Sequence, residues 1–281
     1  MTMTDVQSQL DRALELGDEG LFAEMADLLE RALEEAPDDA YLLGWLGVAA
    51  RELEQSGVAY DLFKRCLAQN PQDPHLLALA GAGLAAFDDA DAEPALRAAA
   101  VMAPDVAFTR LQYGAYLARE GLFEEALENL RAAVALAEDD PTVHGELGIA
   151  LALKGDHAGA AAAMEEALEL APDDSWTRVL LGLVLLEEGR TEEAAETLVR
   201  ASLERMEDAE AQVLAALAAA AVGWEESAEE AAARAAYAPE GADAALLADM
   251  DERIASAGAA RDFLLATMAP SVLHERLTQP L

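Results

Sequence analysis

The side chains that could perform catalysis or bind a metal are few and scattered. The four histidines are His75, His144, His157 and His274, and no two are four residues apart, the spacing that places two metal ligands on one helix face. The single cysteine, Cys66, has no second cysteine with which to form a disulfide and no clustered histidine with which to form a zinc site. Glycine-rich phosphate loops are absent as well. The sequence therefore predicts no enzyme activity, no cofactor and no metal site.

Adjacent glutamates are the remaining candidates for chemistry, because paired carboxylates can serve in acid–base catalysis or bind calcium. Such pairs include those at positions 124–125, 165–166, 192–193, 225–226 and 229–230. They recur with the repeat described below on the expected outer helix faces, and none shows the alternation of acidic residues around a glycine that calcium loops use. We interpret them as a solvated surface.

Charge restricts the class of partner. The chain has 55 acidic and 18 basic residues, for a net charge of −37. Such a surface disfavours nucleic acids and anionic membranes and favours a protein partner with basic flanks. Solubility or adaptation to a salty cytoplasm would explain the same charge. The longest apolar runs, residues 76–87 and 213–224, are shorter than the roughly 20 residues of a membrane span, and no secretory signal opens the chain, so we expect a cytoplasmic protein.

A repeat of about 34 residues organises the chain. Helix-ending phrases such as Ala-Pro-Asp-Asp recur at residues 37, 71, 104, 138, 172, 206 and 239, in steps of 34, 33, 34, 34, 34 and 33. Each interval accommodates two amphipathic helices: in residues 107–137 a first apolar stripe ends at Gly121 and a second begins near Ala126. Asp140 and Pro141 then suit the start of the next helix, as N-cap and first-turn residue.

Small residues recur at the points where helices of a pair would cross, since close crossings admit no larger side chain. The first helices carry Gly47, Gly81, Gly114, Gly148 and Gly182. The second helices carry an early alanine (Ala59, Ala92, Ala126, Ala160, Ala194, Ala228) and a later one (Ala32, Ala99, Ala133, Ala167, Ala201, Ala235), with Cys66 in the later position once. We therefore expect Cys66 to be a small core residue.

This pattern resembles the tetratricopeptide repeat family, over residues 6–240 and seven repeats. The first and last repeats depart from it, with Ala13 and Ala216 in place of the crossing glycine. The resemblance implies an all-α fold, a right-handed superhelical solenoid of antiparallel helix pairs. We expect the array over residues 1–240, C-terminal capping helices over 241–269 and a tail over 270–281.

The resemblance also implies a concave groove lined by the first helix of each pair, and a scaffold or adaptor that binds a peptide or amphipathic helix there. The Lys, Asn and Arg residues with which some relatives clamp a C-terminal carboxylate are missing. The expected groove residues are Tyr41, Phe108, Leu111, Arg119, Ile149, Trp176, Val179, Leu183, Leu186, Val213 and Leu217.

Two alternatives remain for the apolar groove. The array itself, a second copy of the chain or the C-terminal tail could cover it, and Leu273 and Leu277, four residues apart, would suit the last of these. The chain could also be a structural subunit that self-assembles through its terminal repeats or tail.

Overall fold

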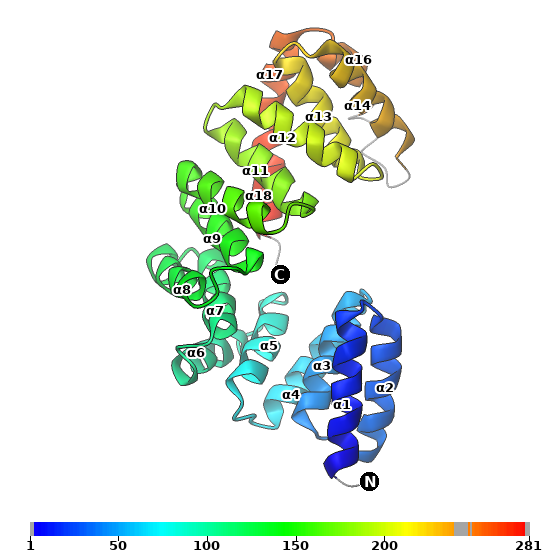
Figure 1. Ribbon diagram of the computed structural model, residues 1–281, viewed down its shortest axis with the longest axis vertical. Coiled ribbons are helices and arrows are strands. Elements are labelled where there is room, and N and C mark those ends of the chain that lie inside the picture. Colours follow the sequence, from blue (N-terminus) through cyan, green and yellow to red (C-terminus); the bar gives the residue numbers. More distant parts are fainter. Residues whose placement is uncertain (1–2, 239–246, 248, 279–281) are drawn as a thin grey trace. The chain divides into compact units, whose positions relative to one another are not determined.

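The computed structural model describes residues 3–238, 247 and 249–278, and over these residues the chain is helical, without strands (Figure 1). Contacts divide it into two compact units. The N-terminal unit comprises residues up to 117 together with 128–136, and the C-terminal unit comprises residues 118–127 and 137–279. Consecutive helices pack as pairs within each unit. The expected all-α solenoid of helix pairs is confirmed.

Each repeat contributes two helices. The first helices are α1 (Met3–Asp18), α3 (Ala40–Glu52), α5 (Pro74–Ala85), α7 (Ala107–Arg119), α9 (Pro141–Lys154), α11 (Ser175–Glu187) and α13 (Ala209–Ala221). The second helices are α2 (Phe22–Glu35), α4 (Ser56–Ala68), α6 (Ala92–Met102), α8 (Phe123–Leu136), α10 (His157–Leu170), α12 (Thr191–Glu204) and α14 (Glu225–Tyr237).

Aspartates cap the first helices, as the sequence predicted for Asp140. The Asp140 carboxylate accepts a hydrogen bond from the Thr142 backbone N–H, and Pro141 occupies the first turn of α9. Equivalent side-chain caps begin four further first helices: Asp39, Asp73, Asp174 and Asp208. These caps satisfy backbone donors that a helix start leaves free, and so they fix where these five repeats begin.

The crossing glycines lie where their neighbours leave no space for a side chain. A Cβ on Gly148 would lie 2.8 Å from Met164 and 3.2 Å from the Ala160 carbonyl oxygen, and one on Gly182 would lie 2.6 Å from Leu198. The early alanines of the second helices, such as Ala160, are buried. The close crossing predicted from small residues is therefore confirmed at these positions.

The turn inside each helix pair uses a left-handed backbone conformation. It is occupied by glycine in five repeats, at positions 20, 121, 155, 189 and 223, and by Glu54 (φ 59°) and Asp88 (φ 52°) in the other two. A residue with a Cβ pays about 1 kcal/mol or more for this conformation, and glycine does not. All seven repeats therefore have the same turn, including the two in which Glu54 and Asp88 adopt it at a conformational cost.

Replacing Glu54 with glycine should therefore raise the free energy of unfolding by about 0.5–1 kcal/mol, because relief of the strain outweighs the added freedom of the unfolded chain. Gly155→Ala should lower it by about 1 kcal/mol, since a Cβ there meets nothing within 4 Å and only the positive φ opposes it. Urea unfolding followed by circular dichroism measures both. A Glu54→Gly variant less stable than wild type would show that the glutamate side chain contributes more than its conformation costs.

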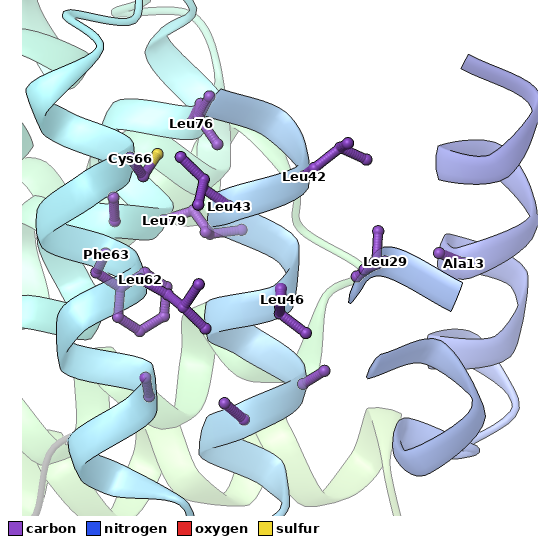
Figure 2. Close-up of a cluster of buried hydrophobic side chains, with 14 of the residues drawn as sticks. Ala13, Leu29, Leu42, Leu43, Leu46, Leu62, Phe63, Cys66, Leu76 and Leu79 are labelled. Carbon is purple, nitrogen blue, oxygen red and sulfur yellow. The ribbon is translucent and has the colours of Figure 1, made fainter. Parts of the chain in front are cut away.

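Phe63 occupies the centre of the N-terminal unit's core (Figure 2). Its ring lies between α3 and α5, where Gly47 and Gly83 leave room for it. Cys66, one turn further along α4, is fully buried, and burial raises the pKa of its thiol to about 12. The prediction that Cys66 is a small core residue is confirmed.

A second periodic contact holds the loops that precede repeats four to seven. In each of these repeats a first-helix side chain forms a hydrogen bond with a backbone carbonyl at the end of the preceding repeat. Arg110 bonds Pro104, Arg178 bonds Pro172 and Gln212 bonds Arg205, while a His144 ring nitrogen contacts the Glu138 carbonyl oxygen at 2.9 Å. The donors are spaced 34 residues apart, so they belong to the repeat although their residue types differ. These bonds satisfy carbonyls that would otherwise have no helical partner.

The C-terminal segment continues as helix beyond the repeats. It comprises α16 (Met250–Ile254), α17 (Ala257–Phe263), the π-helical turn η1 (Leu264–Met268) and α18 (Ala269–Thr278). Part of the capping-helix region expected over 241–269, and the last residues of the expected tail, lie outside the described residues. Most of the segment expected as a tail is thus a helix, and Pro270 lies in its first turn rather than at the end of the helical segment.

Candidate partner-binding groove

Helix α18 lies against the first helices of the C-terminal unit (Figure 1). It packs on α11 and α9, while α17 and η1 pack on α13. The side chains of α18 divide cleanly between two faces: Val272, Leu273, Arg276 and Leu277 are buried, whereas those at 271, 274, 275 and 278 are exposed. An amphipathic helix of the chain itself therefore occupies the face on which the sequence placed an open apolar groove.

The π-helical turn explains how the helix continues past Pro270. Proline has no backbone N–H, so a regular α-helix would lose one bond at this residue. Just before it the Ala269 N–H donates to the Leu264 carbonyl, five residues back, and the wider turn absorbs the mismatch. Helix α17, before this turn in the sequence, contacts α13, and α18, after it, contacts α11 and α9. The turn thus lies where the segment passes from one repeat to the next.

Arg276 is the polar centre of the α18 contact. Its Nε and Nη2 lie 2.9 Å and 2.5 Å from Oε1 of Glu210, and Nη2 lies 3.8 Å from Oδ2 of Asp208. The guanidinium carbon lies 4.6 Å from the centroid of the Trp176 ring. Glu210 and Asp208 come from the start of α13 and Trp176 from the start of α11, so Arg276 joins α18 to two successive repeats.

Most of the predicted groove residues are buried rather than available on an open surface. The first helices of the C-terminal unit pack chiefly on the second helix of their own pair and on that of the preceding repeat, as α11 packs on α12 and α10. The residues concerned are Leu111, Ile149, Val179, Leu183, Leu186, Val213 and Leu217. In the C-terminal unit α18 packs on α9 and α11, two of the first helices expected to line the groove, and the assignment of these residues to a partner-binding groove stays a prediction.

Four predicted residues have polar or aromatic contacts. Tyr41 is 42% exposed and its hydroxyl donates to Asp73 at 2.5 Å, a hydrogen bond that raises the pKa of Tyr41 to about 12. Arg119 is paired through two hydrogen bonds with the buried carboxylate of Glu146. Trp176 contacts Arg276, as described above. None of these contacts requires a bound ligand.

Phe108, the fourth, belongs to an aromatic stack that crosses three repeats of the N-terminal unit. Its ring stacks on His75 at 4.3 Å between centroids, and His75 stacks on Trp45 at 6.1 Å. Phe108 was predicted in the groove, whereas Trp45 was not, because it lies one helical turn beyond Tyr41, the residue predicted for its own repeat.

Within the described residues, no group of three His, Cys, Asp or Glu side chains could hold a metal ion. No helix in the same part of the chain is long and apolar enough to cross a membrane.

Two family models, both described as tetratricopeptide repeat, match this sequence, one over residues 10–74 and 113–175 and the other over 151–221. Together they cover more than half of the chain. The chain belongs to the tetratricopeptide repeat family. The resemblance suggested by the 34-residue spacing is thereby confirmed, and this fold supports a role as a protein–protein interaction scaffold.

Solved structures of other tetratricopeptide repeat proteins share the fold. The thermophilic TPR protein TTC0263 of Thermus thermophilus is 29% identical over 64% of this chain and 99% of its own, with a TM-score of 0.53. The Cut9-Hcn1 structure gives a TM-score of 0.68 at 18% identity, over 86% of this chain and 48% of that one. The type IV pilus biogenesis factor PilW gives 0.61 at 17% identity, over 72% and 94%. The last two likenesses concern the fold alone. No functionally curated protein matches the sequence at a significant level.

Proposed function

We propose that this protein is a non-enzymatic adaptor, and that its C-terminal unit binds a helical segment of a partner protein on the face that α18 occupies. The observation that supports this is the contact of α18 with α9 and α11. Because α18 packs on two successive first helices, its buried side chains indicate what kind of partner helix this face could bind. An amphipathic partner helix placed in such a groove is a common mode of protein recognition.

The buried face of α18 defines that chemistry. Val272 and Leu273 lie one turn before Arg276 and Leu277, so the helix presents two adjacent pairs of buried side chains. Each fully buried Val or Leu contributes about 1.5–3 kcal/mol before ordering costs. A partner helix with the same pattern could replace α18, provided that it overcomes the advantage that covalent attachment gives to α18.

Charge would favour a partner with basic flanks. The net charge of −37 attracts cationic segments at long range, and this attraction weakens as salt rises. Binding of such a partner should therefore become weaker with increasing ionic strength, whereas the apolar part of the contact should change little.

A peptide of residues 264–278, labelled with fluorescein, tests the proposal against two full-length proteins. The released variant, Leu273→Asp with Leu277→Asp, places two charges on the buried face of α18 and should free the groove. We expect it to bind the peptide at least about tenfold more tightly than wild type, in which the groove is already occupied. Fluorescence anisotropy measures both affinities.

The control variant, Ser271→Asp with His274→Asp, adds negative charge at two exposed positions of the same helix. It should bind the peptide as weakly as wild type. If the released variant is folded by circular dichroism and binds no peptide, the groove does not accept a helix in trans and the proposed function is wrong.

Self-assembly is the alternative, with α18 exchanged between two copies of the chain. Light scattering over a range of concentrations separates the two functions. An adaptor keeps the mass of one chain throughout, whereas a self-assembling subunit gains mass as its concentration rises. A gain in mass by wild type that the released variant loses would favour the alternative.

A further inference from the structure

The surroundings of Arg276 form a pocket with three different walls. The face of the Trp176 ring closes one side, the Glu210 carboxylate accepts from Nε and Nη2, and the Asp208 carboxylate lies 3.8 Å from Nη2. Arg276 itself is only 7% exposed. A flat aromatic face combined with carboxylates suits a guanidinium, which is planar, weakly hydrated and able to donate several hydrogen bonds at once.

Other contacts hold the pocket in place. Asp208 caps α13 by accepting from the Ala211 N–H at 3.0 Å, and its second oxygen accepts from Arg205 Nε at 2.9 Å. Both carboxylates lie at the start of α13, where the helix dipole favours negative charge. The Asp208 wall is therefore fixed by the repeat rather than by Arg276, and we expect it to persist when α18 leaves.

One donor in the pocket remains unused. The Nη1 atom of Arg276 is buried and has no hydrogen-bond partner. A buried donor without a partner costs free energy, so α18 does not satisfy the pocket completely. A segment that seats its guanidinium slightly differently can gain the bond that α18 lacks.

We propose that Trp176, Asp208 and Glu210 form an arginine-recognition pocket, which selects partner helices that carry arginine between apolar residues at the spacing seen in α18. This inference rests on the proposed function, because it names the side chain that the groove recognises. Arginine is favoured over lysine because an ammonium group is a compact charge that cannot stack on the indole or donate from a planar fork.

The test compares three peptides of residues 264–278 on the released full-length variant: the natural sequence, Arg276→Lys and Arg276→Gln. We expect lysine to weaken binding about tenfold and glutamine more, because lysine retains the charge and loses the planar donors. In the protein, Glu210→Gln should weaken binding of the natural peptide about tenfold, whereas Glu207→Gln, which removes an exposed charge three residues away, should not.

The outcomes separate this inference from the proposed function. If no peptide binds, the proposed function itself fails. If all three peptides bind equally, the groove accepts a helix but the arginine pocket is wrong. A second measurement needs no released variant: hydrogen exchange of α18 in full-length Arg276→Lys and Arg276→Gln proteins. Faster exchange of α18 in both variants than in wild type supports the pocket. If α18 exchanges as slowly with lysine at position 276 as with arginine, the proposed selectivity for arginine is wrong.

Discussion

Replacing Gly83 with alanine is expected to destabilise the N-terminal unit by about 2 kcal/mol. A Cβ at this position would lie 2.2 Å from Cε2 of the Phe63 ring, far inside van der Waals contact. The ring cannot move away, because it is buried and a Cβ on Gly47 would lie 2.6 Å from its other edge. Overpacking of this kind costs about 1–3 kcal/mol and outweighs the higher helix propensity of alanine. Urea unfolding followed by circular dichroism measures the change.

Two further variants show whether the ring is the cause. Gly57→Ala in α4 meets nothing within 4 Å, so it should leave stability unchanged or raise it slightly. Combining Gly83→Ala with Phe63→Leu should destabilise less than the sum of the two single changes, by about 1 kcal/mol, because the smaller side chain vacates the space that alanine needs. If the double variant is destabilised by the full sum of the two single changes, Gly83 is required for a reason other than its contact with Phe63.

Replacing Arg119 with methionine should destabilise the C-terminal unit by about 3–5 kcal/mol. Arg119 donates to both carboxylate oxygens of Glu146, at 3.1 and 3.3 Å, and the Glu146 side chain is 2% exposed. Without arginine, a buried carboxylate loses its cationic partner, and its desolvation is no longer offset. The free energy of unfolding in urea gives the magnitude.

The double variant Arg119→Met with Glu146→Met should recover most of that loss, since two apolar side chains of suitable volume need no ionic partner. Lys154→Met is the matched control: Lys154 pairs with Glu124 at 3.4 Å, but both side chains are at least 40% exposed. Its removal should change stability by no more than about 1 kcal/mol. A single Arg119→Met variant as stable as the control would show that water reaches Glu146.

The repeat spacing was sufficient to predict the helix pairs, their caps and the small residues at their crossings. These features depend on neighbours within one or two repeats, so a periodic sequence contains them directly. Gly83 was not predicted, because it is required by the size of one side chain, Phe63, and no other repeat has a phenylalanine at that position. The loop-anchoring side chains were missed for a related reason: Arg110, His144, Arg178 and Gln212 share a position but not a residue type.

The groove was the least predictable feature. Apolar side chains on the first helices look alike in sequence whether they face solvent, a neighbouring repeat or another helix. Leu273 and Leu277 suggested that the C-terminus could cover the groove, but residues 270–281 were expected to form a tail beyond the capping helices. The contact between Arg276 and Glu210 joins residues 66 positions apart and has no periodic counterpart from which it could be inferred. Burial of Val179 and Leu183 therefore became evident only from the structure.

Under the proposed function, an occupant that belongs to the same chain sets a threshold for its competitors. The effective concentration of α18 is high, so a weak partner would be excluded at any ordinary abundance, and a strong one would bind only above a level fixed by how firmly α18 is seated. A change on the buried face of α18 would shift that level without altering the receiving surface. Substitutions in α18 would then change the partner concentration needed for binding, whereas substitutions around Trp176 would change which partners bind.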